Sequence, residues 1–205
     1  MANAQQLLML REIEAWNAWR AKHPHTKIDL RDAILIGYDL RQADLARANL
    51  TGAHLAGAYL DRARLVSAVL KNAKLFRAHM GSADLEGANL AGADLGGAHL
   101  GDASLIRANL RGALLRGTNF YGASLDKADL RNAQLGRTIF GNVDLSGVKG
   151  LQSVEHVEAS TVGLDTYCKS KGKIPDSFLE GAGVPDNVRL QLASLFKQKN
   201  GKPRR

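Results

Sequence analysis

From Leu30 to Leu145 every fifth residue is large and apolar: twenty-one are leucine, and the others are Met80, Phe120 and Phe140. Alanine stands two positions before most of these residues. A helix repeats every 3.6 residues and a strand every two, so neither element explains a period of five. The period indicates a chain that turns a corner after every five residues.

Each five-residue unit has two apolar positions that face inward and three polar or small positions that face outward. Four units form the four sides of one coil, so twenty residues complete a turn. Twenty-four units therefore predict about six coils, stacked about 4.8 Å apart as parallel strands. The expected fold class is an all-β solenoid over residues 28–149, in which each coil bonds to its neighbours.

Glycine usage supports corners at regular positions. Ten units, the first at Gly37 and the last at Gly147, carry glycine two positions after the large apolar residue. A type II turn needs a positive φ at that position, where glycine has no steric cost. We expect type II corners at these glycines, and other turn types where Arg, Asn or Ser stands instead.

The segments that flank the repeats break the five-residue period. Leu7, Leu10, Ile13 and Trp16 have helical spacing, which predicts one helix over residues 4–22 that ends before Pro24. We expect residues 1–27 to cap the first coil, because open strand edges otherwise pair with other chains. Residues 150–199 predict a small helical C-terminal cap, and residues 200–205 a disordered basic tail.

Composition sets limits on the class of protein. The net charge of +8 divides into +2 over residues 1–27, +3 over 28–149 and +3 over 150–205. Cys168 is the single cysteine, which excludes an intrachain disulfide and favours a reducing compartment. The apolar run at residues 7–10 is too short for a signal peptide, and no run is long enough to span a membrane. We expect a cytoplasmic protein with no membrane contact.

The units, such as Ala43-Asp44-Leu45-Ala46-Arg47 and Ala88-Asn89-Leu90-Ala91-Gly92, resemble the A(D/N)LXX repeat of the pentapeptide-repeat family. The resemblance covers residues 28–149 and implies a right-handed quadrilateral β-helix. Residues 160–186 are similar to a segment that follows the repeats in some bacterial proteins with Toll/interleukin-receptor-like domains. That second resemblance implies a bacterial protein that is an accessory or shortened relative of defence proteins.

Catalytic chemistry is not indicated by the residue pattern. No Ser-His-Asp, paired-carboxylate or phosphate-binding glycine motif stands out, so we expect neither an enzyme nor a cofactor. His79 and His99 are twenty residues apart and therefore neighbours on one face. Two imidazoles alone do not complete a zinc site, so we predict no metal.

Two surfaces are candidates for partner binding. The first is apolar and rimmed by arginine, which is typical of protein contacts; part of it, Ile34 and Ile36, could instead lie beneath the N-terminal helix. Its members are Ile34, Ile36, Phe76, Leu114, Arg77 and Arg116. The second is a positive patch that suits an acidic protein or a phosphate backbone. Its members are Arg107, Arg111, Lys127 and Arg131.

These observations favour a non-enzymatic scaffold that binds another, unidentified protein. Nucleic-acid binding is disfavoured, because Asp126 and Asp129 lie near the positive patch and aromatic stacking platforms are missing. The family resemblance raises an alternative, since some members imitate duplex DNA and act on DNA gyrase. Such imitation needs an acidic rod, and the repeats here carry +3. We expect a monomer, or a homodimer formed through the C-terminal cap.

Overall fold

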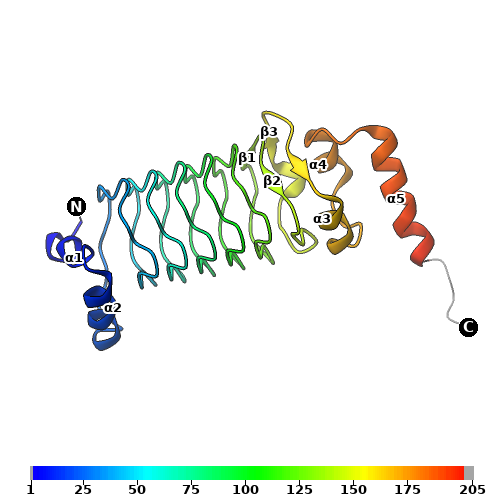
Figure 1. Cartoon of the computed structure of the whole chain (residues 1–205). Helices are drawn as coiled ribbons and strands as arrows, with labels where there is room; N and C mark the ends of the chain where they lie inside the picture. Colours follow the sequence, from blue (N-terminus) through cyan, green and yellow to red (C-terminus); the bar gives the residue numbers. More distant parts are fainter. Residues whose placement is uncertain (1, 201–205) are drawn as a thin grey trace, which may run out of the picture.

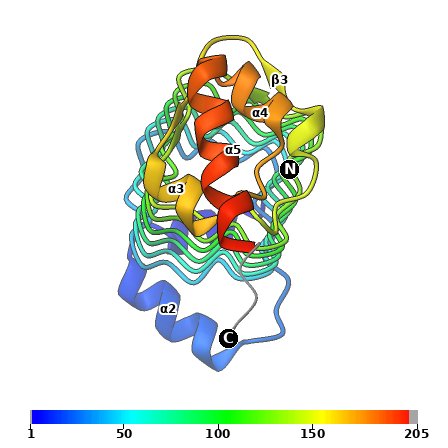
Figure 2. The same cartoon turned by 90° about the vertical axis from the view of Figure 1, so that its right-hand side faces the viewer.

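The computed structural model describes residues 2–200, and they form a rod of stacked coils with helices at both ends (Figure 1). The elements in chain order are α1 (Ala4–Met9), α2 (Ile13–Lys22), β1 (Gln134–Leu135), β2 (Ile139–Phe140), a 3₁₀ turn (Leu151–Ser153), β3 (Glu155–His156), β4 (Thr161–Val162), α3 (Leu164–Lys169), α4 (Asp176–Gly181) and α5 (Asp186–Asn200). Viewed along the rod, the coils superimpose into one outline (Figure 2).

Residues twenty apart are hydrogen-bonded neighbours between Asp29 and Lys149. Asn109, for example, donates its N–H to the carbonyl of Ala88 at 2.9 Å, and its own carbonyl accepts from Leu90 at 2.7 Å. These parallel bridges define four sides, which we call A to D. Side A carries Asp29, Asn49, Val69, Asn89, Asn109 and Asp129; side B carries Ile34, His54, Lys74, Asp94, Leu114 and Gln134; side C carries Asp39, Tyr59, His79, His99, Asn119 and Ile139; side D carries Asp44, Arg64, Asp84, Ser104 and Ser124.

The core runs along the axis of the rod. The large apolar residues at the five-residue positions are all at most 1% exposed. Burial of one such side chain contributes roughly 1.5–3 kcal/mol. Two buried threonines, Thr118 and Thr138, stand at alanine positions, and each hydroxyl donates to a carbonyl of the preceding coil at 2.8 Å. The phenyl rings of Phe120 and Phe140 stack with centroids 5.5 Å apart. The inward pattern predicted from the sequence is therefore correct.

The corners differ from the prediction in one respect. The glycines from Gly37 to Gly122 at these positions have φ between 63° and 70°, but Arg62, Asn72 and Ser82 also have positive φ, between 54° and 57°. The expectation of a different turn type at Arg, Asn or Ser was wrong. Each corner must turn the chain onto the next side of the coil within the same five residues, so the backbone holds L-residues in the left-handed region as well. Gly147 is the exception among the glycines, since its φ is not positive.

The N-terminal segment forms two helices where one was predicted. α1 ends at Met9, Leu10 is its C-cap, and α2 begins at Ile13 after an extended Glu12 with φ of −121°. The break lets two large side chains, Leu10 and Trp16, enter the core end, and both are fully buried. A single straight helix could not place both there. In Figure 2, α2 lies along one edge of the rod's outline and does not cross its centre.

Parallel pairing continues beyond residue 149, where the sequence predicted that the solenoid ends. Gln134 pairs with Glu155 and Ile139 pairs with Thr161, which are separations of twenty-one and twenty-two residues. The inserted residues end the five-residue period but keep the strand ladder. α3, α4 and α5 follow this last part of the ladder. Of the predicted tail, Asn200 is the last residue of α5, and residues 201–205 lie outside the described residues.

Within the described residues, no helix is long and apolar enough to cross a lipid bilayer.

Gly57→Ala is expected to lower the free energy of unfolding by about 1 kcal/mol, because an L-residue is strained at its φ of +63°. A Cβ at Gly57 meets no heavy atom within 4 Å, so the substitution tests backbone strain without a steric clash. Gly101→Ala is the control, since its φ is not positive and its nearest heavy atom is 3.6 Å away. Urea denaturation should show a loss for Gly57→Ala only; equal effects of the two variants contradict the assigned corner geometry.

His156 predicts a pH-dependent stability for the C-terminal end. Both of its ring nitrogens are buried with no hydrogen-bond partner among the described residues, and its ring meets that of Phe178 edge-on at 5.1 Å. Burial lowers the pKa of this imidazole below its usual 6.5. The unfolded chain therefore takes up the proton first, so stability falls as the pH falls below 6.5.

Thermal unfolding of the wild type between pH 8 and 5 should show this loss, and His156→Leu should reduce its slope. His79→Leu, which changes a histidine on side C, is the control. An unchanged slope for His156→Leu would show that this imidazole does not titrate differently in the folded state.

Candidate protein-contact surface

The most exposed aliphatic residues of the solenoid lie on side B of the first coil. Ile34 is 69% exposed and Ile36, at the following corner, is 57% exposed. Neither lies beneath α1 or α2, so the reading of these residues as part of the cap packing was wrong. The helices cover the core end through Leu10 and Trp16, and leave side B open.

Phe76 extends this apolar area along the same corner. It is 46% exposed and stands in one column with Ile36 and Ala56, which lie forty and twenty residues earlier. Its ring lies over Gly96, where an added Cβ would be 3.1 Å from the ring. The guanidinium of Arg77 lies 5.1 Å from the ring centroid. Ile34, Ile36, Phe76 and Arg77 form what we call the N-terminal apolar patch.

Leu114 and Arg116 lie two coils beyond Phe76, as Phe76 lies two coils beyond Ile36. Leu114 shares the ladder of Ile34 but lies four coils away, about 19 Å along the rod. The polar side chains of His54, Lys74 and Asp94 stand between them. Arg116 and Arg137 both pair with Glu158, so these two arginines are partly neutralised. The six predicted residues are therefore spread along the rod, and their use as one contact surface stays a prediction.

Three of the four residues of the predicted basic patch have an acidic neighbour. Arg131 donates from Nε to Asp129 at 2.8 Å, and this pair lowers the pKa of the Asp129 carboxyl. Arg107 lies 3.7 Å from Glu86, and Lys127 lies 3.8 Å from Asp126. Arg111 has no ion pair among the described residues. The acidic neighbours Asp126 and Asp129 were expected from the sequence, and binding of a partner by the basic patch stays a prediction.

A short motif explains the strongest of these pairs. Asp-Leu-Arg occurs at residues 29–31, 39–41 and 129–131, and in each case the arginine pairs with the aspartate two residues earlier. The carboxylate also accepts the backbone N–H of the arginine. Hydrogen bonds from Arg31 lower the pKa of Asp29 to about 2. The same pairing lowers the pKa of Asp39 and raises that of Arg41.

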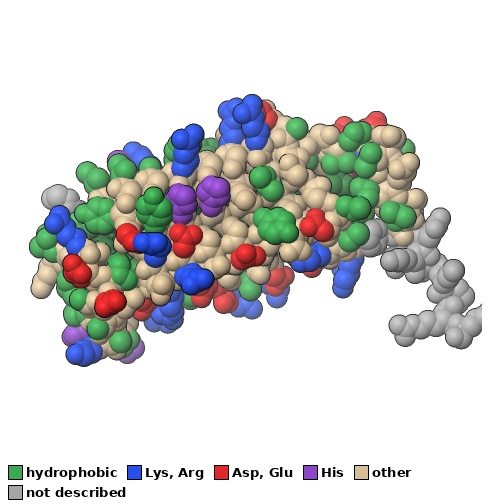
Figure 3. All heavy atoms as spheres, viewed as in Figure 1, with side chains coloured by type: hydrophobic (Ala, Val, Ile, Leu, Met, Phe, Trp, Pro, Cys, Tyr) green, Lys and Arg blue, Asp and Glu red, His purple; other side chains and the backbone are tan. Residues whose placement is uncertain are grey.

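The histidine pair on side C is a stack and not a chelating site. The rings of His79 and His99 are 5.5 Å apart and nearly parallel, and Tyr59 stacks on His79 at 4.8 Å. Figure 3 shows two histidine side chains, in purple, side by side on this face of the rod. Among the described residues, no three His, Cys, Asp or Glu side chains form a group that could hold a metal ion. Parallel rings direct their nitrogen lone pairs along parallel lines, which do not meet at one metal ion.

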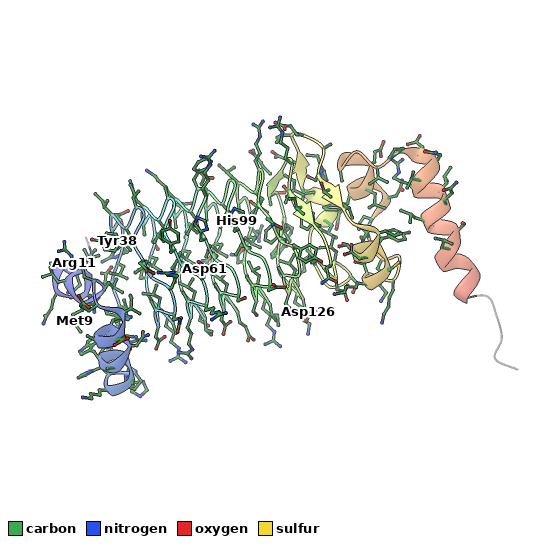
Figure 4. The ribbon with its side chains drawn as sticks, in the orientation of Figure 1. Met9, Arg11, Tyr38, Asp61, His99 and Asp126 are labelled. Atoms are coloured by element: carbon green, nitrogen blue, oxygen red, sulfur yellow. The ribbon has the colours of Figure 1, made fainter. Side chains whose placement is uncertain are left out.

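Sequence reasoning missed a cleft between α2 and side C. Its volume is about 720 Å³, and its lining includes Glu14 and Asn17 of α2 and Asp39, Arg41 and Asp61 of the coils. Figure 4 shows Asp61 on the solenoid surface in this region. No sequence signal indicated this cleft, because a helix that covers a core carries polar residues on its solvent face in any case.

Sequence comparison places the chain in a family. The pentapeptide repeats family matches in eight copies at residues 26–55, 43–81, 83–120 and 108–147, which is more than half of the chain. The chain therefore belongs to the pentapeptide repeats family. No curated protein matches the chain in a sequence comparison.

Several solved structures are similar to this chain. Rfr23, a pentapeptide repeat protein from the cyanobacterium Cyanothece 51142, is 36% identical with a TM-score of 0.44, and the match covers 45% of this chain and 63% of that one. A pentapeptide repeat protein of the Arabidopsis thaliana thylakoid lumen is 28% identical with a TM-score of 0.25, covering 50% and 68%. A trypsin-treated form of QnrB1, a plasmid-mediated fluoroquinolone resistance protein, is 19% identical with a TM-score of 0.41, covering 88% and 92%. The chain thus spans less than two thirds of the length of Rfr23.

Ile36→Asp and Phe76→Asp are expected to change the free energy of unfolding by less than about 0.5 kcal/mol each, because both side chains point outward. Leu35→Asp, one residue from Ile36 but fully buried, should prevent folding. Circular dichroism and urea denaturation measure all three. A large loss of stability for Ile36→Asp would show that this residue packs inside the protein.

Proposed function

We propose that this protein is a non-enzymatic scaffold that binds another protein through the N-terminal apolar patch. The observation that carries the proposal is the exposure of Ile34 and Ile36 on a rigid side of the rod, with Phe76 and Arg77 two coils further along the same corner. Apolar side chains held in place by a fixed backbone lose little conformational entropy on binding. The arginine beside the phenyl ring gives the patch a polar margin, which is typical of protein interfaces.

The test compares partner capture by three folded proteins. Wild type, the double variant Ile36→Asp/Phe76→Asp and the control Leu114→Asp are immobilised and exposed to an extract of the native host. One protein should bind to wild type and to Leu114→Asp and be lost from the double variant, because only the double variant places carboxylates in the patch. Titration calorimetry with that purified partner should repeat the loss. Equal binding by the double variant contradicts the proposal.

The C-terminal end supports a second proposal, which concerns oligomeric state. Leu190 of α5 is 73% exposed and Leu164 at the start of α3 is 64% exposed. Leu164 also lines an apolar cavity of about 260 Å³ with Tyr167, Leu179 and, from α5, Val188 and Leu192. We propose that the chain is a monomer that can dimerise through this face, in line with the expectation of a cap-mediated homodimer. Light scattering over a range of protein concentrations distinguishes the two states.

Other assignments stay proposals with less support. The similarity of residues 160–186 to segments of Toll/interleukin-receptor-domain proteins suggests a role beside bacterial defence proteins, and gene neighbourhood tests this. Action on gyrase as a DNA mimic is disfavoured by the charge of +3 over residues 28–149. Direct nucleic-acid binding is disfavoured by the ion pairs of Arg107, Lys127 and Arg131. A cytoplasmic location is proposed from Cys168, the single cysteine of the chain.

A further inference from the structure

The first coil has a strand edge that is closed on two sides and open on the other two. In the second to fifth coils, each side bonds to the coil before it through three backbone groups. On side B of the second coil these are the N–H and carbonyl of His54 and the carbonyl of Ala56, and they bond to Ala33, Leu35 and Gly37 at 2.8 to 3.0 Å. The equivalent groups of the first coil have no preceding coil to bond to.

Side-chain amides take the place of the missing coil on sides A and D. Gln6 accepts from the N–H of Asp29 at 2.9 Å and donates to the carbonyl of Lys27 at 3.0 Å. Asn17 does the same on side D, accepting from the N–H of Asp44 at 2.8 Å and donating to the carbonyl of Gln42 at 3.0 Å. The carbonyl of Asp29 accepts from the N–H of Asn3 at 2.8 Å, and the carbonyl of Asp44 accepts from the indole N–H of Trp16 at 3.0 Å. The groups of Asp29 and Asp44 that would face a preceding coil are thus bonded.

Sides B and C have no such substitute. Within residues 2–200, nothing bonds to the N–H or carbonyl of Ile34 and Asp39, or to the carbonyls of Ile36 and Arg41. These six groups lie in sequence order along two adjoining sides, and all four residues are exposed. An edge with unpaired N–H and C=O groups is a template for another strand. The cap helices therefore seal the core and half of the edge only.

The surroundings of the open edge define what can bind there. On side B the edge adjoins the exposed side chains of Ile34 and Ile36. On side C it borders the cleft of about 720 Å³ beneath α2, where Asp39 and Arg41 pair with each other. Glu14, Asp61 and Arg62 also line that cleft, and none of the three has an ion pair among the described residues. The remaining charge of the cleft is therefore negative.

We propose that the partner inserts an extended segment that adds a strand to sides B and C of the first coil. The inference rests on the proposed function and names the way in which the partner is recognised. Strand addition takes affinity from main-chain hydrogen bonds and specificity from alternate side chains. The segment carries apolar residues two positions apart beside Ile34 and Ile36, and a lysine or arginine that enters the cleft near Glu14 and Asp61. Figure 4 shows Tyr38 on the first coil, with Met9 and Arg11 on the helical segment at the same end of the rod.

The open edge itself is tested by one matched pair of proline variants. Ile34→Pro removes an N–H that bonds to nothing in the chain, so the protein should keep its thermal midpoint. His54→Pro, on the same side one coil further along, removes the hydrogen bond from the N–H of residue 54 to the carbonyl of Ala33. This variant should have a lower thermal midpoint than the wild type. Amide exchange of the wild type gives an independent reading: Ile34 and Asp39 should be unprotected, and Asp29, Asp44 and His54 protected. Protection at Ile34 and Asp39 overturns the proposal.

The occupant is tested with random dodecapeptides displayed on phage and selected on the wild-type protein. Peptides with apolar residues at alternate positions and a basic residue should be enriched, and should shift the amide resonances of Ile34 and Asp39. Their binding should be lost with Ile34→Pro, weakened with Glu14→Gln and kept with Ile34→Val, which retains the N–H. No enrichment, or equal binding to Ile34→Pro, overturns the proposal. A wild-type dimer that Ile34→Pro dissociates also overturns it, because a second copy then occupies the edge.

The two proposals fail in different ways. A partner that is lost with Ile36→Asp/Phe76→Asp but binds normally to Ile34→Pro uses the side chains of the patch and not the backbone edge. In that case the proposed function stands and strand addition is wrong.

Discussion

The structure depends on one constraint: the chain must return to the same place every twenty residues, so that each coil satisfies the backbone groups of the next. The bridges from Asp29 to Lys149 all keep that spacing. Buried peptide groups without partners would each cost about 1–3 kcal/mol, so the spacing cannot drift within the solenoid. The constraint explains why a residue such as Arg62 holds a positive φ, which an arginine rarely adopts. Local strain at a corner costs less than a break in the ladder.

The same constraint makes the two ends of the rod unlike its middle. At the C-terminal end the pairing is lengthened to twenty-one and twenty-two residues before the helices begin. At the N-terminal end Gln6 and Asn17 stand in for a coil on two sides. Arg20 adds donors to the carbonyls of Asp44 and Ala46 on side D. Sides B and C of the first coil keep unpaired backbone N–H and C=O groups. In our proposal a strand from another chain forms hydrogen bonds to these groups.

The five-residue period was enough to predict the solenoid, its inward residues and the adjacency of residues twenty apart. Asn89 and Asn109, for example, are joined by a side-chain hydrogen bond of 3.1 Å, as adjacency implies. The period could not show which charged side chains pair, because pairing depends on rotamers and on neighbours across a corner, as for Arg107 and Glu86. Nor could helical spacing show the break after Met9, which arises from fitting Leu10 and Trp16 into the coil end. The open edge was beyond sequence reasoning, since it is a property of hydrogen bonds and not of residue types.

Disulfide formation between engineered cysteines tests the twenty-residue return most directly. Ser104 and Ser124 are bridge partners on side D, so their Cα atoms lie about 4.8 Å apart, within the range of a disulfide. In a Cys168→Ser background, Ser104→Cys/Ser124→Cys should form an intramolecular disulfide on mild oxidation, seen as a mass loss of two hydrogens. Ser104→Cys/Asp144→Cys, two coils apart, should remain reduced. A protein in which the first pair stays reduced, or the second pair is oxidised equally well, does not have the coil described above.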